Sequence, residues 1–123
     1  LDDISVSYGN LGEAFFVCCE NSGAIVGTVA IKREDNRVAL LRRIFVHPEY
    51  RRRQVGSMLM DRAIEFCREV GYQEIVFKTT SNMTGAIKLC LNKNFIERAK
   101  LNLGGVELLK FTLFLKENSP LAE

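Results

Sequence analysis

Three consecutive arginines lie between an apolar segment and a long helical pattern, in the stretch VHPEYRRRQVGSMLM at residues 46–60. Pro48 ends the apolar segment, and the helical pattern begins just after Arg51, Arg52 and Arg53. The first turn of a helix presents backbone N–H groups without partners, and these donors and the helix dipole favour an anion. Arginine adds charge and a fork of donors, so phosphate is the natural ligand.

The residues after the arginines suit the same chemistry. Gly56 lets a phosphate approach the backbone closely, and Ser57 adds a hydroxyl group. The stretch lacks the G-K-[ST] of a P-loop and the three glycines of a dinucleotide fingerprint. Two other interpretations therefore stay open, a solvated arginine turn and a patch that binds nucleic acid.

The composition is that of an ordinary globular domain. The chain has 123 residues, of which 47% are hydrophobic and 26% charged, and its net charge of +2 is too small to indicate nucleic acid by itself. We predict a single domain, 1–123, with its core in 13–115 and a loose tail at 117–123. No apolar run approaches a membrane span and the first residues do not resemble a signal peptide, so we expect a cytoplasmic protein without a membrane partner.

The four cysteines and the one histidine, His47, do not form a metal-ligand pattern, so no metal site is predicted. Cys18 and Cys19 are neighbours on an expected strand and would point to opposite faces, which disfavours a disulfide between them. All four cysteines are expected to be reduced thiols.

Three antiparallel strands are predicted before the arginines. Runs rich in aromatic and β-branched residues, separated by turn clusters, occupy 13–20, 24–33 and 37–47. The pattern in residues 1–8 is too short to distinguish the end of a helix from a loop.

The clearest helix is predicted at 54–70, where a wide apolar stripe suits a helix lying on a sheet and Gly71 ends it. A strand at 73–78 follows, so 37–78 forms a β-α-β unit with a parallel strand pair and a right-handed crossover.

A second helix is predicted at 83–92, with Ser81 or Asn82 as its N-cap and Asn94 left-handed after it. A hairpin of 95–100 and 106–115, turning at Gly104-Gly105, closes the chain. The order β-β-β-α-β-α-β-β predicts a mixed α/β sheet with two helices.

Two segments in this order resemble the GNAT superfamily of acetyl-CoA-dependent N-acetyltransferases, over roughly 13–115. The stretch IFVHPEYRRRQVGSMLMDRAIEF is similar to that family's pyrophosphate loop, R/Q-x-x-G-x-G/A, with Arg51 and Gly56 at matching positions. GAIKLCLNKNF is similar to its A-x-x-L-Y-x-x-x-G-F helix end. The resemblance implies a mixed, mostly antiparallel sheet around the β-α-β unit. The family's N-terminal strand and helices are expected to be missing or shortened in this chain.

The resemblance also implies a cofactor site. Acetyl-CoA would lie in a cleft where the strands before and after the long helix splay apart, and the backbone at Phe45 and Val46 would hydrogen-bond its arm and acetyl group. One main-chain amide would stabilise the oxyanion formed when an amine attacks the acetyl carbon directly. The expected cofactor contacts are Phe45, Val46, Arg51, Arg52, Arg53, Gln54, Val55, Gly56, Ser57 and Asn82.

The chain departs from the family pattern at several positions. Gln54 stands at the loop's first glycine, where a positive φ would be strained, and Asn94 replaces a glycine at mild cost. Cys90 stands where the family often has a tyrosine that protonates the departing thiolate. A thiol donates only weakly, and a small buried hydrophobe is an equally good interpretation of Cys90.

No general base can be named from the sequence. A lysine-like amine is neutral in about one molecule in 10³ at pH 7, yet the strand 37–46 carries no carboxylate. Glu13, Glu20 and Glu49 are the nearest acids, and His47 has a suitable pKa at a position expected to face solvent. Cys90 and Glu13 are the weak catalytic candidates.

The predicted function is transfer of an acetyl group from acetyl-CoA to a primary amine of a small molecule or peptide. The alternative is a non-catalytic acyl-CoA-binding or regulatory module. Only twelve residues precede Glu13. We therefore expect either that the chain is a fragment, or that its acceptor site is open or is completed by another subunit, as in a homodimer.

Overall fold

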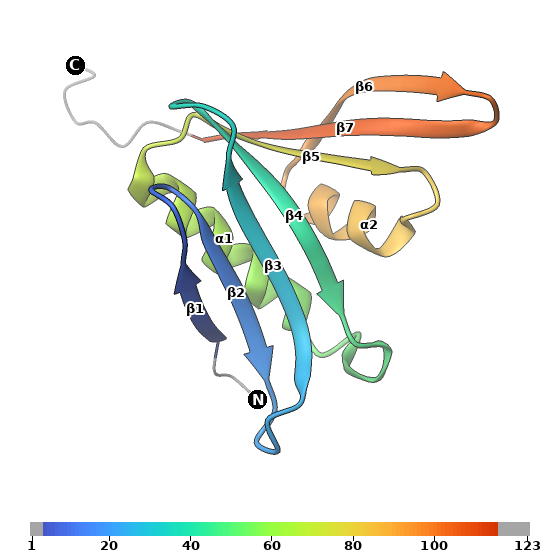
Figure 1. Cartoon of the computed structure of the whole chain (residues 1–123). Helices are drawn as coiled ribbons and strands as arrows, with labels where there is room; N and C mark the ends of the chain where they lie inside the picture. Colours follow the sequence, from blue (N-terminus) through green and yellow to red (C-terminus); the bar gives the residue numbers. More distant parts are fainter. Residues whose placement is uncertain (1–3, 116–123) are drawn as a thin grey trace.

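The computed structural model describes residues 4–115 and shows one seven-stranded sheet with two α-helices (Figure 1). The strand order in the sheet is β1-β2-β3-β4-β5-β7-β6. In chain order the elements are β1 Ile4–Tyr8, β2 Ala14–Cys19, β3 Ile25–Arg33, β4 Val38–Val46, the 3-10 helix η1 Pro48–Tyr50, α1 Val55–Val70, β5 Glu74–Thr80, α2 Thr84–Asn92, β6 Ile96–Leu103 and β7 Val106–Phe114.

The predicted fold class is confirmed. β4 and β5 pair in parallel across α1, while every other strand pair is antiparallel. The helix ends at Gly71 with a φ of 100°, and Asn94 is left-handed with a φ of 73°, both as predicted. The predicted tail, 117–123, lies outside the described residues.

An N-terminal strand is present among the described residues. Ile4–Tyr8, which the sequence left between a helix end and a loop, is strand β1 and pairs with β2 from Ile4↔Cys18 to Tyr8↔Ala14. Between β1 and β2 the described chain makes a turn without a helix.

The predicted cap of the second helix is wrong. The N-cap of α2 is Met83, without a side-chain hydrogen bond, and neither Ser81 nor Asn82 occupies that position. The Asn82 Oδ1 atom instead accepts a hydrogen bond from the Thr80 hydroxyl, so it is turned back toward β5 and away from the helix amides.

Helix α1 covers one face of strands β2 to β4 (Figure 1). Its buried residues Val55 and Leu59 lie against Gly27 of β3, and Phe66 makes an edge-to-face contact with Phe16 of β2 at 6.0 Å between ring centroids. Helix α2 lies beside the N-terminal half of α1, where Lys93 Nζ is 2.8 Å from Asp61 Oδ1. This packing holds the N-terminus of α1 at the end of β4.

Within residues 4–115 no disulfide joins any of the four cysteines; Cys18, Cys67 and Cys90 are buried and Cys19 is half-buried. Among residues 4–115 there is no cluster of three or more histidine, cysteine or acidic side chains that could hold a metal ion. Neither described helix has the length and hydrophobicity that crossing a membrane requires.

Candidate active site

The parallel strands β4 and β5 stay paired over only three residues. The pairs run from Val38↔Glu74 to Leu40↔Val76, and beyond them the strands separate. The register of β4 against β3 shifts at the same level, where Arg43 is left-handed with a φ of 55° and its carbonyl accepts a 2.7 Å hydrogen bond from the Thr28 hydroxyl. Such a bulge bends a strand and redirects its side chains, so the end of β4 turns away from β5.

A cavity of about 540 Å³ lies beside the end of β4, the part of that strand that is no longer paired with β5. We call it the cleft. β4, the arginine loop, the start of α1 and the start of α2 all contribute to it. Its lining residues are Ile44, Phe45, Val46, Arg51, Arg52, Gly56, Asn82, Met83, Thr84, Gly85, Ala86, Lys88 and Leu89.

Six of the ten predicted cofactor contacts line the cleft, and the other four lie around it. Gln54 and Ser57 line a neighbouring hollow of about 560 Å³. Arg52 and Lys88 line both this hollow and the cleft, whereas Lys93 lines the hollow alone. The Arg53 guanidinium lies over the Tyr50 ring, 5.1 Å from its centroid. Val55, the first residue of α1, has a buried side chain, so only its backbone could contact a ligand. The predicted set is therefore gathered at the N-terminal end of α1.

The first turn of α1 opens onto this region. The first intrahelical bond runs from Met58 N to the Gln54 carbonyl, so the backbone N–H groups of 55–57 have no acceptor within the helix. Gln54 provides no side-chain cap. Three amides, the positive end of the helix dipole and nearby basic side chains form an environment suited to phosphate.

Arg51 braces the loop against the end of β4. Its Nε donates a 3.2 Å hydrogen bond to the Val46 carbonyl. This bond fixes the direction in which β4 enters the 3-10 helix and uses one of the five guanidinium donors, leaving the others for a ligand.

Gln54 has the left-handed conformation in which the sequence analysis expected strain, with a φ of 65°. Replacing Gln54 with glycine should therefore raise the free energy of unfolding by about 1 kcal/mol, because the Cβ penalty disappears. Chemical denaturation of the two proteins checks this expectation. An equal or lower midpoint for Gln54→Gly would contradict it.

The acids and the histidine considered as bases lie away from the cleft. His47 Nδ1 accepts a 3.1 Å bond from the Glu49 amide and its ring lies edge-on to Tyr50, so His47 caps η1. Glu20 accepts from the Ser22 hydroxyl in the β2–β3 turn. None of these three predicted candidates, His47, Glu20 and Glu49, is among the cleft-lining residues.

The two weak catalytic candidates have other surroundings. Glu13 accepts a 2.9 Å bond from the Arg33 amide and lies 3.5 Å from Lys32 Nζ; the Arg33 bond is the main reason its pKa is lowered. Cys90 is fully buried, and burial raises the pKa of its thiol to about 12. Neither side chain lines the cleft.

The sequence analysis missed the contribution of α2 to the cleft. Gly85, Lys88 and Leu89 recur at helical spacing and place one side of the helix against the cavity. That spacing, with a glycine in the first turn and a lysine one turn later, is a signal that could have identified them.

A comparison with models of protein families identifies the family of this chain. A model described as the acetyltransferase (GNAT) family matches residues 3–95. The chain belongs to the GNAT family.

Named relatives and solved structures agree with this family and with the overall fold. A mouse (Mus musculus) protein, N-acetyltransferase 8F1, is 29% identical over 98 residues, covering 76% of this chain and 44% of its own length. A GNAT-family acetyltransferase of Staphylococcus aureus superposes with a TM-score of 0.79 at 28% identity, covering 89% of this chain and 72% of that one. A GNAT-family acetyltransferase of Elizabethkingia anophelis, solved with acetyl-CoA bound, superposes with a TM-score of 0.71 at 16% identity, covering 85% and 77%.

The chain spans about half the length of the curated relatives it matches, at 47%, 44% and 42% of three of them. The match to the GNAT model includes β1 to α2, and so contains the cleft and the arginine loop.

Proposed function

We propose that the chain binds acetyl-CoA in the cleft and transfers its acetyl group to a primary amine. One observation carries this proposal: the splayed end of β4 and β5 opens directly beside the free amides of α1. A long ligand with an apolar arm and a diphosphate suits that combination, because the cleft is lined partly by apolar side chains while the helix terminus favours negative charge. Membership of the GNAT family supports this choice of cofactor.

The proposed contacts follow from the lining. The main-chain groups of Phe45 and Val46 would hydrogen-bond the pantetheine arm, which lies along β4 as an added strand would. The amides from Arg52 to Ser57 would surround the diphosphate, with Arg52 adding charge. Asn82 would contact the cofactor from the opposite wall of the cleft.

The acetyl transfer needs little from side chains. A neutral amine would attack the thioester carbon, and a main-chain N–H of β4 would stabilise the oxyanion. The C–S bond then breaks as the coenzyme thiolate departs, and the nitrogen loses its extra proton to water. A thiolate whose conjugate acid has a pKa near 8.5 is a fair leaving group, so protonation by Cys90 is not required. Glu13 and Cys90 are not proposed as catalytic groups, because neither reaches the cleft.

Deprotonation of the amine is the demanding step. Among residues 4–115, the cleft lining contains no aspartate, glutamate or histidine. We then expect water to remove the proton. The rate of acetylation of an amine with a pKa near 10.4 should rise about tenfold per pH unit between pH 7 and 9, as its neutral fraction rises.

A second candidate function, a non-catalytic acyl-CoA-binding module, is favoured by that same lack of a base. Release of free coenzyme A thiol from acetyl-CoA, followed spectrophotometrically with a panel of primary amines at pH 7, 8 and 9, separates the two. We expect amine-dependent release that increases with pH. Coenzyme A binding without release for any amine would establish the binding module instead.

A further inference from the structure

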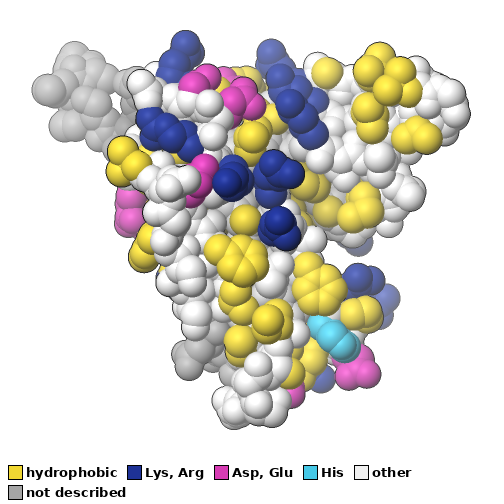
Figure 2. Space-filling model, viewed as in Figure 1, with side chains coloured by type: hydrophobic (Ala, Val, Ile, Leu, Met, Phe, Trp, Pro, Cys, Tyr) yellow, Lys and Arg dark blue, Asp and Glu magenta, His cyan; other side chains and the backbone are white. Residues whose placement is uncertain are grey.

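A second pocket lies on the face of the sheet opposite α1, which we call the open face. Phe15, Ala30 and Arg42 are register partners on β2, β3 and β4, so their side chains point to this face. The pocket has a volume of about 410 Å³ and is lined by Phe15, Ala30, Lys32, Glu13, Ser7 and Arg43 among others. Figure 2 views this face, where lysine and arginine side chains gather in the middle beside exposed hydrophobic ones.

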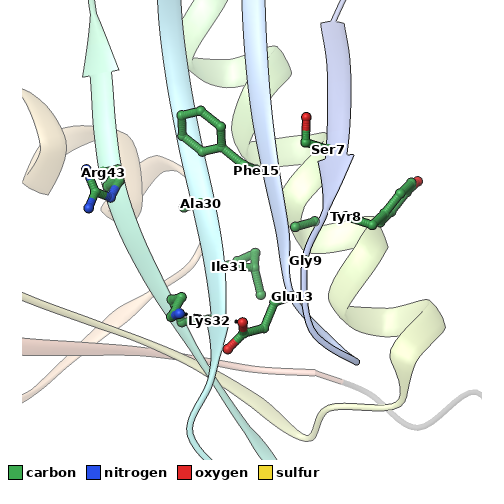
Figure 3. A pocket seen from close by; sticks show the side chains of 10 residues that line it. Ser7, Tyr8, Gly9, Glu13, Phe15, Ala30, Ile31, Lys32 and Arg43 are labelled. Carbon is green, nitrogen blue, oxygen red and sulfur yellow. Dashed lines mark hydrogen bonds and ion pairs between the residues drawn. The ribbon is translucent and has the colours of Figure 1, made fainter.

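In this open-face pocket two charged side chains pair with each other and a third does not form an ion pair within the described residues. Glu13 and Lys32 lie together at one end (Figure 3), 3.5 Å apart, and the Glu13 carboxylate also accepts the Arg33 amide. Hydrogen bonding to the Arg33 amide keeps the pKa of Glu13 low, so its carboxylate stays ionised at neutral pH. Arg43 is exposed on β4, and within the described residues its guanidinium forms no ion pair. The pocket therefore has one cation left for a ligand.

An apolar wall lies between the two charged ends. The Phe15 ring lies over β3 beside Ala30, with Arg43 on the neighbouring strand (Figure 3). Phe15 is 36% exposed, which is large for an aromatic side chain in the middle of a sheet face. A ligand with an apolar group and an anion would cover the ring and pair with the guanidinium.

Arg43 also links this pocket to the cleft. It is the left-handed residue at which β4 turns away from β5, and the next three residues, Ile44, Phe45 and Val46, line the cleft. A molecule held by the Arg43 guanidinium is thus next to the end of β4 whose backbone is proposed to hold the thioester.

We propose that the open-face pocket is the acceptor site and that it selects amines bearing a carboxylate and an apolar group. This inference rests on the proposed function for where the acetyl group lies. The anion site itself does not depend on the proposed function. Arg43 pairs with the carboxylate, Phe15 covers the apolar group, and the amine is directed toward the cleft. A charge-assisted pair of this kind is worth about 1.5–3 kcal/mol, which is roughly 10- to 100-fold in the specificity ratio.

The test compares phenylalanine with phenylalaninamide as acceptors, because the two differ only at the carboxylate. Amidation lowers the pKa of the amine and increases the neutral fraction, so intrinsic reactivity favours the amide. We expect kcat/KM to be at least about tenfold higher for phenylalanine. A ratio of one or less in the native chain would overturn the inference.

Arg43→Gln keeps an unbranched stem with a polar end, although a shorter one, and removes its charge. We expect the ratio to fall to about 1 through loss of activity on phenylalanine, with little change for the amide, and Arg43→Lys to recover part of the difference. Arg62→Gln, an exposed arginine on α1, is the matched control and should keep the native ratio. Equal losses on both acceptors in Arg43→Gln would show a structural role and contradict the proposal.

Binding without turnover separates this inference from the proposed function. Titration with N-acetylphenylalanine and with its amide, followed by NMR, measures the anion site alone. Preference for the free acid that depends on Arg43 supports the site, even if no amine releases thiol, in which case only the proposed transferase activity fails. Thiol release with no carboxylate preference in either measurement overturns the inference and leaves the transferase intact.

Discussion

Gly56→Glu is expected to weaken coenzyme A binding at least about 100-fold. Gly56 lies in the first turn of α1 and lines the cleft, so a glutamate side chain there would enter the space proposed for the diphosphate. Two negative charges about 4 Å apart repel by roughly 4 kcal/mol at an effective dielectric constant of 20, which exceeds the 2.7 kcal/mol that 100-fold requires. Calorimetric titration with coenzyme A measures the change.

The same substitution should leave the fold intact. A Cβ at position 56 would come within 3.0 Å of Leu89 Cδ2 and 3.3 Å of Val46 Cγ2, both ends of side chains that can shift slightly. An acid in the first turn also interacts favourably with the helix dipole. Unchanged affinity in a folded Gly56→Glu protein would refute the assignment of the loop.

Gln73→Glu is the matched control for charge. It adds one negative charge just beyond the opposite end of α1, where the Gln73 Oε1 atom accepts from Arg37 Nε. Its coenzyme A affinity should stay within about twofold of the native value, since a distant surface charge is screened by salt. A loss comparable with that of Gly56→Glu would show that net charge, not position, controls binding.

Gly27→Ala should lower the free energy of unfolding by about 2 kcal/mol, through overpacking between β3 and α1. A Cβ there would lie 2.8 Å from Leu59 Cδ1, 2.9 Å from Val55 Cγ1 and 3.1 Å from the Phe45 carbonyl oxygen. The two side chains belong to the buried face of α1, and the carbonyl belongs to a strand that walls the cleft. Relief by moving α1 would also displace its N-terminus, so coenzyme A affinity should fall together with stability.

Gly85→Ala provides the comparison for this second prediction. No heavy atom lies within 4 Å of a Cβ at Gly85, and alanine is favoured over glycine in a helix by up to about 1 kcal/mol. Its thermal midpoint should equal or exceed that of the native chain, whereas that of Gly27→Ala should fall by several degrees. A Gly27→Ala protein as stable as Gly85→Ala would mean that β3 and α1 are not closely packed.

The elements with strong local patterns were predicted well from the sequence. The wide apolar stripe of 54–70 is a property of the helix itself, and Gly71 and the Gly104-Gly105 pair adopt positive φ values that glycine tolerates. The arginine loop was also located correctly at the start of α1, because a strand, a proline and a helix in sequence determine where free amides will be.

The features that depend on distant pairing could not be derived from local patterns. The family resemblance implied a cleft between splayed strands, but the point of separation, after only three pairs of β4 and β5, is set by residues far apart in the chain. The left-handed Arg43 and Arg52 are not glycine or asparagine and give no local sign of their conformation. Asn82 was a reasonable cap by residue type, and only the position of the Thr80 hydroxyl reveals that its oxygen is already engaged.

A crystal structure of the chain with acetyl-CoA tests the central claim most directly. We predict diphosphate oxygens within hydrogen-bond distance of main-chain amides between Arg52 and Ser57, and the pantetheine arm between β4 and β5. A cofactor bound elsewhere on the molecule, with those amides facing solvent, would contradict the proposed site and the chemistry derived from it.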